Sequence, residues 1–394
     1  MPTRERELDL VLFGATGFTG GLTADYLARH APEGCRWALA GRNQAKLEAV
    51  RDRLATVHPS LADLPLLRAD VTEEASLADV ARRARVVATT VGPYLEHGEP
   101  LVAACAAAGT DYVDLTGEPE FVDRMYLGYH DEALRTGARL VHACGFDSVP
   151  HDLGAMFTVQ QLPEGVPLAV RGMVRSNAAF SGGTFASALT ALSRGAQMKR
   201  AAAARRRAEP RPAGRRVRSV ARPPHFDKQA GFWLVPLPTI DPLVVRRSAA
   251  ALDRYGPDFT YSHYAAVRRL PVAVGGLAFV GALGLAAQVP PLRRMLISRV
   301  PQGEGPSEER RARSYFSVRF IGEGGGRTAT TEVRGGDPGY TETAKMLAES
   351  ALSLAFDDNP PTAGQVTTAT AMGQNLLDRL VRAGLTFTVR PDSS

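Results

Sequence analysis

The sequence predicts an α/β fold, in which a doubly wound parallel sheet within residues 1–150 precedes an α+β domain with a mostly antiparallel sheet. Short apolar runs alternate with amphipathic segments along the first 150 residues, and a parallel sheet covered by helices requires this alternation. Beyond it, regions 166–263 and 313–336 are richer in β-type runs, which favour antiparallel strands. Two domains are therefore expected, at 1–150 and 151–394.

Each predicted strand of the parallel sheet is a short apolar run that ends at a turn. These runs cover 8–13, 35–40, 64–69, 85–91, 111–115 and 139–143. Segments with helical periodicity separate them, at 21–30, 43–57, 73–83, 98–108 and 119–136. Ligands of such sheets bind at the carboxyl ends of the strands, where the strand order reverses. The turns after the first four strands are therefore the candidate site.

A glycine-rich turn follows the first strand and opens the first helix. It consists of Gly14, Ala15, Thr16, Gly17, Phe18, Thr19 and Gly20. The first glycine permits a tight reversal, the second lets backbone approach a pyrophosphate, and the third allows close packing of helix on strand. The helix N-terminus then offers free N–H groups to phosphates. Residues 1–150 are therefore predicted to form a dinucleotide-binding Rossmann domain.

The end of the second strand indicates which dinucleotide is bound. An Asp or Glu there would bind a ribose 2′-hydroxyl and repel a 2′-phosphate, but the chain has Arg42. A guanidinium suits a phosphate, so the sequence predicts NADP; a capped or solvated turn is the alternative for Arg42. Asp70 falls where the adenine edge would lie, and a helix N-cap is an equal alternative. The predicted cofactor-binding set also contains Asn43, Val91, Gly92 and Pro93.

Length and composition favour a cytoplasmic protein of two domains. A chain of 394 residues is too long for one ordinary core. Its three cysteines, at 35, 105 and 144, lack the spacing of a metal site or a disulfide framework, so neither is predicted. The charged N-terminus lacks the apolar region of a signal peptide. The net charge of +6 comes mostly from arginine. No aromatic residues interleave the most basic stretch, so no nucleic-acid partner is predicted.

Residues 151–394 are expected to form the substrate domain. The arginine-rich stretch 194–224 cannot bury a core and is predicted to be a mobile loop. It would either dock an acidic partner, such as a carrier protein or an anionic lipid surface, or remain a solvated excursion. Residues 181–184, Ser-Gly-Gly-Thr, would bind an anionic group or cap a helix. The helical part at 340–390 is expected to pack back on the Rossmann domain.

The uncharged run 270–291 is long enough to cross a bilayer. Arginine pairs flank it on both sides, at 268–269 and 293–294, whereas a spanning segment usually has its basic residues on one side. Three interpretations remain open: a buried or homodimer-interface helix, a segment lying in the membrane interface, and a true span.

Short motifs along the chain form a pattern far more specific than the glycine turn alone. They are the turn 14–20, Ala40-Gly41-Arg42, Val91-Gly92-Pro93-Tyr94, Gly98-Glu99-Pro100-Leu101-Val102, Tyr112-Val113-Asp114-Leu115-Thr116-Gly117-Glu118, Gly145-Phe146-Asp147-Ser148-Val149-Pro150, residues 181–184, Gly336-Asp337-Pro338-Gly339-Tyr340, Ala344-Lys345-Met346 and Ala369-Thr370-Ala371-Met372-Gly373. This pattern, which covers nearly the whole chain, resembles the saccharopine dehydrogenase-like oxidoreductases, and within them the actinobacterial trans-acting enoyl reductase group.

The resemblance implies an NADPH-binding Rossmann domain. It implies reduction of a carbon–carbon double bond in an acyl chain that a separate polyketide or fatty-acid synthase carries on its carrier domain, during complex-lipid assembly. It also implies some association with the inner face of the plasma membrane, which would give 270–291 a purpose. His151 departs from the family, in which a small polar residue usually follows Val149-Pro150. The departure concerns local substrate contacts rather than the fold.

Enoyl reduction needs a hydride at the β-carbon, stabilisation of the enolate oxygen, and a proton at the α-carbon. None of the ten tyrosines has a lysine four residues on, which disfavours the Tyr-x-x-x-Lys chemistry of short-chain dehydrogenases. Tyr94 is the best donor candidate because its turn should face the nicotinamide; ring packing beneath the cofactor is the alternative. Asp147 and His151 follow the sixth strand and would reach the same crevice. Their alternatives are a structural Asp–backbone network and a surface or cap role.

Two other function classes remain open. Saccharopine-type formation of a secondary amine from an imine would require fixed cations for substrate carboxylates, and Arg171 or Arg175 would serve. A membrane-docked binding protein would keep the dinucleotide fold without the activity.

Overall fold

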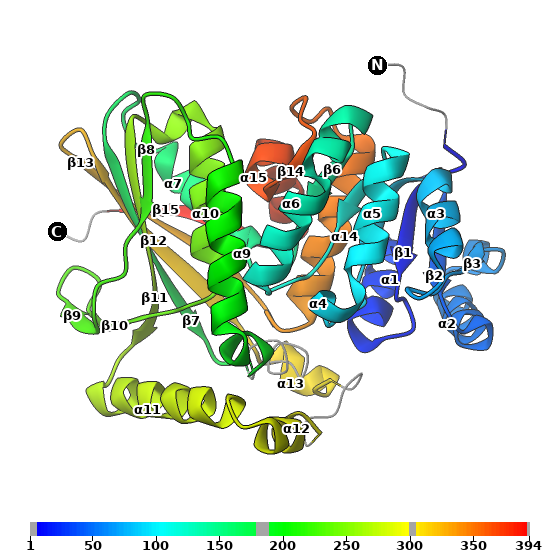
Figure 1. Ribbon diagram of the computed structural model, residues 1–394, viewed down its shortest axis with the longest axis horizontal. Helices are drawn as coiled ribbons and strands as arrows, with labels where there is room; N and C mark the ends of the chain where they lie inside the picture. The colour runs from blue at the N-terminus through cyan, green and yellow to red at the C-terminus, as the bar shows by residue number, and fades with distance from the viewer. Residues whose placement is uncertain (1–5, 179–188, 299–304, 392–394) are drawn as a thin grey trace.

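The computed structural model describes residues 6–178, 189–298 and 305–391. Two β-sheets stand side by side with helices between them (Figure 1). One has seven strands and is parallel; the other has eight and is mostly antiparallel. The predicted α/β class and both predicted sheet types are thus confirmed.

The parallel sheet has the strand order β14-β6-β5-β4-β1-β2-β3. Its strands are β1 (Leu8–Phe13), β2 (Trp37–Gly41), β3 (Leu66–Arg68), β4 (Ala84–Thr89), β5 (Asp111–Val113), β6 (Arg139–Val141) and β14 (Gly364–Val366). The connecting helices are α1 (Phe18–His30), α2 (Gln44–Val57), η1 (Pro59–Leu61), α3 (Glu74–Arg83), α4 (Tyr94–His97), α5 (Glu99–Ala108) and α6 (Pro119–Thr136). Every residue of β1 and β2 is buried, as expected when helices cover both faces. The order reverses between β1 and β4, which defines the switch point.

The C-terminal part of the chain returns to this sheet. Strand β14 pairs with β6, and α14 (Thr341–Phe356) packs against α1 and β4. Leu347 and Ala351 of α14 are fully buried there, so apolar burial holds the C-terminal helices against the parallel sheet. The short helices α15 (Thr368–Ala371) and α16 (Gly373–Arg382) follow.

The second sheet has the order β15-β13-β12-β7-β11-β10-β9, with β8 also paired to β11. Its strands are β7 (Leu168–Ser176), β8 (Arg216–Ser219), β9 (His225–Asp227), β10 (Phe232–Pro236), β11 (Asp258–Val267), β12 (Phe316–Gly324), β13 (Arg327–Gly335) and β15 (Thr386–Arg390). Helix α7 (Val149–Val159) packs on β7, β12 and β13, and α10 (Asp241–Ala251), followed by η2 (Asp253–Tyr255), packs on α7 and β11. A Cβ on Gly154 would lie 2.3 Å from the Phe320 ring, so glycine allows this close approach. We call the face that α7 covers the inner face.

The arginine-rich stretch 194–224 is not the mobile loop that its composition predicts. Helix α9 (Gly195–Ala208) and strand β8 occupy most of it. Arg205 is only 3% exposed, because its guanidinium stacks on the Tyr126 ring at 4.0 Å and hydrogen-bonds to Gln365 and Glu209. The carboxylates of Glu209 and Asp123 neutralise its charge, and Tyr126 and Gln365, distant in the sequence, complete a site for a side chain that local composition assigns to solvent. Residues 181–184 lie outside the described residues.

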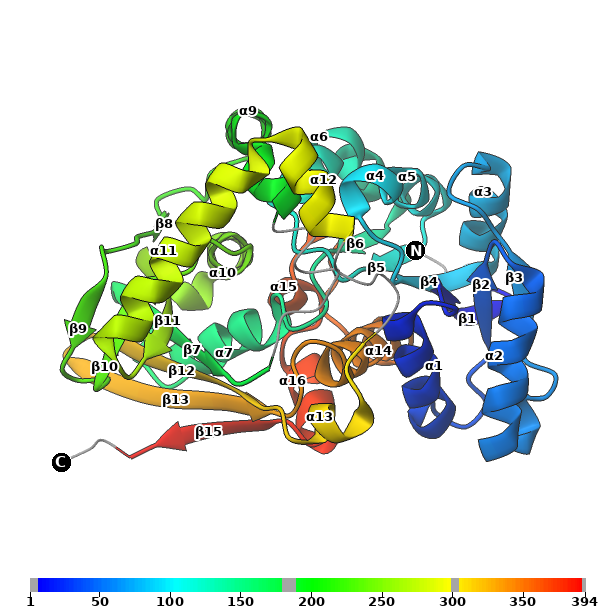
Figure 2. The same ribbon diagram turned by 90° about the horizontal axis from the view of Figure 1, so that it is seen from below.

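Helix α11 (Leu270–Ala287) runs along the outside of the molecule (Figure 2). Its mean hydropathy is 2.0, and only 11% of it is buried; Phe279 is 62% exposed and Leu285 75%. The interpretation as a helix buried within this chain is therefore wrong. By length and composition α11 is able to cross a membrane. Helices α12 (Pro290–Ser298) and α13 (Glu308–Ala312) follow it.

Candidate functional site

The glycine turn lies at the switch point of the parallel sheet. Gly14 has a φ of +93°, a conformation that L side chains rarely adopt. A Cβ on Gly20 would lie 2.1 Å from the Gly14 carbonyl oxygen, so only glycine lets α1 start this close to β1. Gly17 is the N-cap residue of α1 and makes no side-chain cap. The first amides of α1 are thus left for an anion, as a dinucleotide pyrophosphate requires.

The turn after β4 adjoins the glycine turn. The Thr90 hydroxyl donates to the Gly14 carbonyl at 3.1 Å, and a Cβ on Gly14 would lie 2.7 Å from Val91. Val91, Gly92 and Pro93 therefore lie at the same edge of the sheet as residues 14–20. The two turns that are predicted to bind the cofactor together thus lie side by side, and we call this edge of the sheet the crevice.

Arg42 and Asn43 are exposed after β2. Arg42 makes no hydrogen bond or ion pair with any described residue, and binding of a 2′-phosphate stays a prediction for it. Asn43 caps α2, since its side chain accepts from the Lys46 N–H at 3.0 Å. Asp70 accepts from the N–H and hydroxyl of Thr72, at 3.0 and 2.9 Å. Asp70 thus closes the turn before α3, and Asn43 also has a structural role.

The Tyr94 hydroxyl makes its hydrogen bonds inside the protein. It donates to the Thr89 carbonyl and accepts from the Leu115 N–H, both at 3.1 Å, and the residue is 6% exposed. Burial and the negative charge of Asp114 raise the pKa of Tyr94 well above its usual value. The hydroxyl joins the end of β4 to the turn after β5, and its single proton is committed to the Thr89 carbonyl, which disfavours the donor role. The ring packs against Phe121, and packing beneath the cofactor stays a prediction.

Two buried carboxylates also hold these turns together through hydrogen bonds. Glu118 accepts from the N–H groups of Tyr94 and Leu95, at 3.3 and 2.8 Å. Asp114, fully buried, accepts from the Tyr112 hydroxyl and the Ala143 N–H at 3.0 Å each. The motif 112–118 therefore ties β5 to β4 and β6 and stabilises the edge that carries the crevice.

Asp147 lies beyond β6 against the turn that follows β5. A Cβ on Gly117 would lie 3.2 Å from its Oδ2. Its carboxylate has no hydrogen-bond partner among the residues that the structure describes, so the Asp–backbone network expected for it is not formed there. Burial and the negative charge of Asp241 raise the pKa of Asp147 to about 7. A carboxyl group with this pKa exchanges protons near neutral pH.

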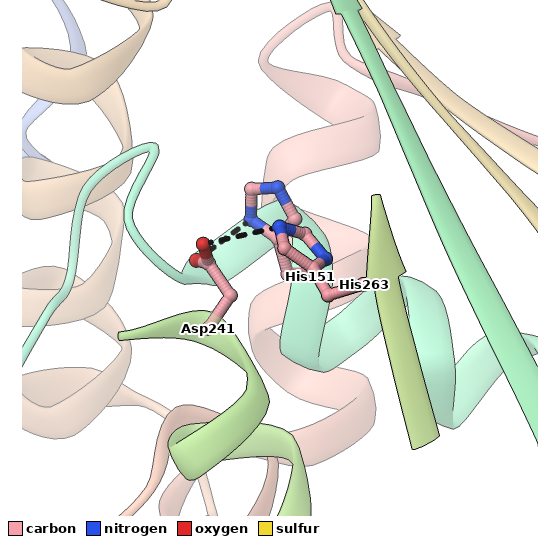
Figure 3. Close-up of side chains that lie close together, drawn as sticks. All are labelled: His151, Asp241 and His263. Carbon is pink, nitrogen blue, oxygen red and sulfur yellow. Dashed lines mark ion pairs between the residues drawn. The ribbon is translucent and has the colours of Figure 1, made fainter. Parts of the chain in front are cut away.

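His151, in the first turn of α7, is 1% exposed; the surface or cap role expected for it is wrong. Its Nδ1 lies 3.2 Å from Oδ1 of Asp241, at the start of α10. The Nε2 of His263, on the inner face of β11, lies 3.4 Å from Oδ2 of the same carboxylate. Figure 3 shows both rings turned toward Asp241. We call these three residues the triad.

Burial and the interactions among the three residues determine the protonation states in the triad. Burial lowers the pKa of His151 to about 4, and His263 adds to this effect while Asp241 opposes it. Burial would raise the pKa of Asp241, but the two imidazoles and the Thr239 hydroxyl outweigh it and hold that pKa below its usual value. At neutral pH the triad therefore contains a neutral His151 ring beside an ionised Asp241.

Sequence reasoning missed Asp241 and His263. Asp241-Pro242 is a typical helix start, and the alternation of β11 places His263 on the same face as Tyr261. Those signals predict where each residue lies in its own element. They do not predict that the three side chains meet, because no spacing along the chain links residues 151, 241 and 263.

Arg171 and Arg175, the candidates for binding substrate carboxylates, lie on the outer face of the second sheet. Their β7 neighbour Gly172 pairs with Phe320 on the inner face, so the alternating arginines point away from α7. Arg171 is paired with Asp227 and Glu323, at 3.0 Å each. This placement gives no support to the amine-forming chemistry.

Similarity to known proteins extends over the whole chain. The family model of the saccharopine dehydrogenase NADP-binding domain matches residues 10–141. A Mycobacterium tuberculosis protein provisionally named a trans-acting enoyl reductase is 41% identical, over 98% of each chain. A trans-acting enoyl reductase of Mycobacterium ulcerans is 38% identical, again over 98% of each chain.

A solved structure shows the same fold. Saccharopine dehydrogenase (L-Glu forming) of Saccharomyces cerevisiae superposes with a TM-score of 0.56 at 14% identity, over 98% of this chain and all of that one. The matched NADP-binding domain indicates NADP as the cofactor, and the geometry of Gly14, Gly20 and Arg42 fits it. The chain belongs to the saccharopine dehydrogenase-like oxidoreductase family, in its trans-acting enoyl reductase group.

Proposed function

We propose that this protein is an NADPH-dependent reductase of a carbon–carbon double bond in an acyl chain held on a synthase carrier domain, in complex-lipid biosynthesis. The full-length similarity to proteins named trans-acting enoyl reductases carries this proposal. The unpaired Arg42 supports a preference for NADPH over NADH, because a guanidinium favours the 2′-phosphate. When bound, the cofactor supplies the hydride; the chain must orient the acyl group and supply a proton.

Asp147 is the proposed proton donor to the α-carbon. Its carboxyl is partly protonated near neutral pH and borders the carboxyl edge of the parallel sheet, where ligands of this fold bind. Asp241 favours the protonated form of Asp147 through its negative charge, and His151 contacts Asp241. We therefore give His151 a positioning role and Tyr94 the role of holding the turns together.

Helix α9 is the proposed docking surface for the carrier domain. It exposes Lys199, Arg200, Arg206 and Arg207, while Arg205 beside them is buried and anchors the helix. A cluster of exposed cations attracts an acidic carrier domain and speeds its encounter.

Helix α11 is proposed to hold the protein at the inner face of the plasma membrane. A true span would require a second crossing, because β12 returns to the same sheet as β11. The residues between α11 and β12 are rich in arginine and glutamate and contain no second long apolar run. The helix therefore lies within one leaflet, with Arg268 and Arg269 among anionic headgroups.

The reductase assay uses purified protein, NADPH and trans-2-enoyl thioesters of several chain lengths, each on a carrier domain and as a small free thioester. We expect NADPH consumption, a product heavier by two hydrogens, one deuterium transferred from labelled NADPH, and faster turnover on the carrier domain. Protein that binds NADPH but never oxidises it would favour a non-catalytic binding protein.

Membrane contact is tested by flotation with vesicles containing anionic lipid. Phe279→Asp with Leu285→Asp should abolish flotation and leave NADPH binding unchanged. A wild-type protein that stays off vesicles but forms dimers, which the same pair of substitutions dissociates, would instead assign α11 to a homodimer interface.

A further inference from the structure

His151, Asp241 and His263 bring three metal-ligating atoms together from three different elements (Figure 3). One ligand atom of each residue lies within 4.8 Å of the other two. The residues are 1%, 1% and 4% exposed, so bulk water does not fill the space between them. Within the described ranges, this is the one group of three His, Cys, Asp or Glu side chains with such geometry.

Each member of the triad directs an unpaired polar atom into the cluster. His151 Nδ1, Asp241 Oδ1 and His263 Nε2 are buried and lack a hydrogen-bond partner in the described part of the chain. The carboxylate lies 3.2 Å from His151 Nδ1 and 3.4 Å from His263 Nε2, so the rings and the carboxylate attract one another without a well-formed hydrogen bond. Leaving one buried polar atom unpaired costs about 1–3 kcal/mol. Three such atoms at one point indicate a ligand between them.

The donor atoms of the triad suit a transition-metal ion. Zinc binds histidine nitrogen and carboxylate oxygen at about 2.0–2.1 Å, so two ligand atoms at the tetrahedral angle lie roughly 3.3–3.4 Å apart. His151 Nδ1 lies 3.2 Å from Asp241 Oδ1, whereas the 3.4 Å separation of His263 Nε2 is from Oδ2, the oxygen that also accepts from Thr239. Calcium and magnesium prefer all-oxygen sites, whereas two imidazoles with one carboxylate suit zinc and other transition metals.

The far sides of His263 and Asp241 are held as metal ligands require. His263 Nδ1 lies 3.2 Å from the Tyr261 hydroxyl. The Thr239 hydroxyl donates to Asp241 Oδ2 at 2.5 Å, which leaves Oδ1 unpaired. Such partners fix the tautomer and orient each ligand toward the metal.

We propose that His151, Asp241 and His263 bind one Zn²⁺ ion. Three protein ligands leave the fourth tetrahedral position open, which is the arrangement of zinc sites that bind water or a substrate oxygen. The Asp241 carboxylate, whose pKa is held below its usual value, supplies negative charge to balance the ion. The site is separate from the glycine turn and Arg42, so its occupancy does not depend on the proposed reductase activity.

The test measures metal content of the full-length protein, purified without a metal-affinity tag. The protein is treated with a chelator, reloaded with Zn²⁺ and desalted. Wild type should retain about one zinc per chain, and loading with Co²⁺ should give the visible absorption of a four-coordinate site. His263→Gln and Asp241→Asn should each retain at least tenfold less zinc. His225→Gln, on β9 of the same sheet, should retain as much as wild type.

Circular dichroism and NADPH binding show whether each variant is folded. Folded wild-type protein that keeps no zinc after reloading would overturn the site, as would zinc retained in both folded variants. If both variants fail to fold, the Tm of the wild-type protein is measured with zinc and with the chelator. Zinc should raise this Tm and the chelator should lower it. An unchanged Tm rejects the proposal. Because no acyl substrate is present, the result is independent of the reductase assay.

Discussion

The crevice at the glycine turn and the triad beneath the second sheet are built in opposite ways. The crevice takes most of its residues from one stretch, 14–20, and from the ends of neighbouring parallel strands. The triad takes one residue each from α7, α10 and β11. Its first and last members, His151 and His263, are more than a hundred positions apart in the sequence. Exposed groups such as Thr16 and Arg42 belong to the crevice, whereas the triad is buried. A local motif thus predicts a cofactor site, while a buried cluster depends on which elements pack together.

Asp147 joins the two regions, and its loss should have the largest effect. Asp147→Asn should lower turnover by about 10²–10⁴-fold, the usual worth of a general acid, with little change in NADPH affinity. The protonated carboxyl is the active form, so in metal-free protein turnover should fall about tenfold per pH unit above a pKa of about 7. Steady-state kinetics across pH measures both. A wild-type pH profile retained by the variant would remove Asp147 from the chemistry.

Gly20→Ala should damage only the crevice. Its new Cβ would lie 2.1 Å from the Gly14 carbonyl oxygen, and relieving such a clash costs about 1–3 kcal/mol or more. NADPH titration and thermal unfolding should both show a loss. Gly21→Ala is the matched control, because the nearest atom to its Cβ would be 3.7 Å away. Equal effects from the two substitutions would contradict the special role of Gly20.

Arg42→Ala should weaken NADPH by roughly 10–100-fold, since a hydrogen-bonded charge on phosphate contributes about 1.5–3 kcal/mol, and should leave NADH binding unchanged. Arg68→Ala, at the end of neighbouring β3 with its guanidinium paired to Glu73, is the control. Isothermal titration with both cofactors measures the difference. Parallel weakening of NADPH and NADH would show that Arg42 does not contact the 2′-phosphate.

Tyr94→Phe should have the smallest effect on rate. It removes the hydrogen bonds to Thr89 and Leu115 and should lower the free energy of unfolding by about 1–2 kcal/mol. Turnover should change less than threefold on this order-of-magnitude reasoning. Tyr315→Phe, whose ring is 44% exposed, should leave stability unchanged. A large fall in turnover without loss of stability would restore Tyr94 as the donor.

Sequence patterns predicted six of the seven strands of the parallel sheet but not β14, which comes from the C-terminal part of the chain. Strand β1 and helix α6 have the predicted bounds, 8–13 and 119–136, because apolar periodicity and turn residues are local signals. The prediction of a mobile loop over 194–224 was wrong because it used only local charge density. Arg205 is stabilised by Tyr126 and Gln365, which lie far from it in the sequence.

By itself, the sequence determined the strand, glycine turn and helix that begin the NADP-binding domain of this protein. Glycines at 14 and 20 are required by backbone geometry within one turn, and Arg42 ends the neighbouring strand, so spacing alone predicts their association. Only the tertiary structure decided the state of the side chains around Asp147. The parallel pairing of β11 with β7 and the packing of α10 on α7 bring Asp241 and His263 to His151. Burial then sets their charges, and neither pairing nor burial can be read from residues so far apart in the chain.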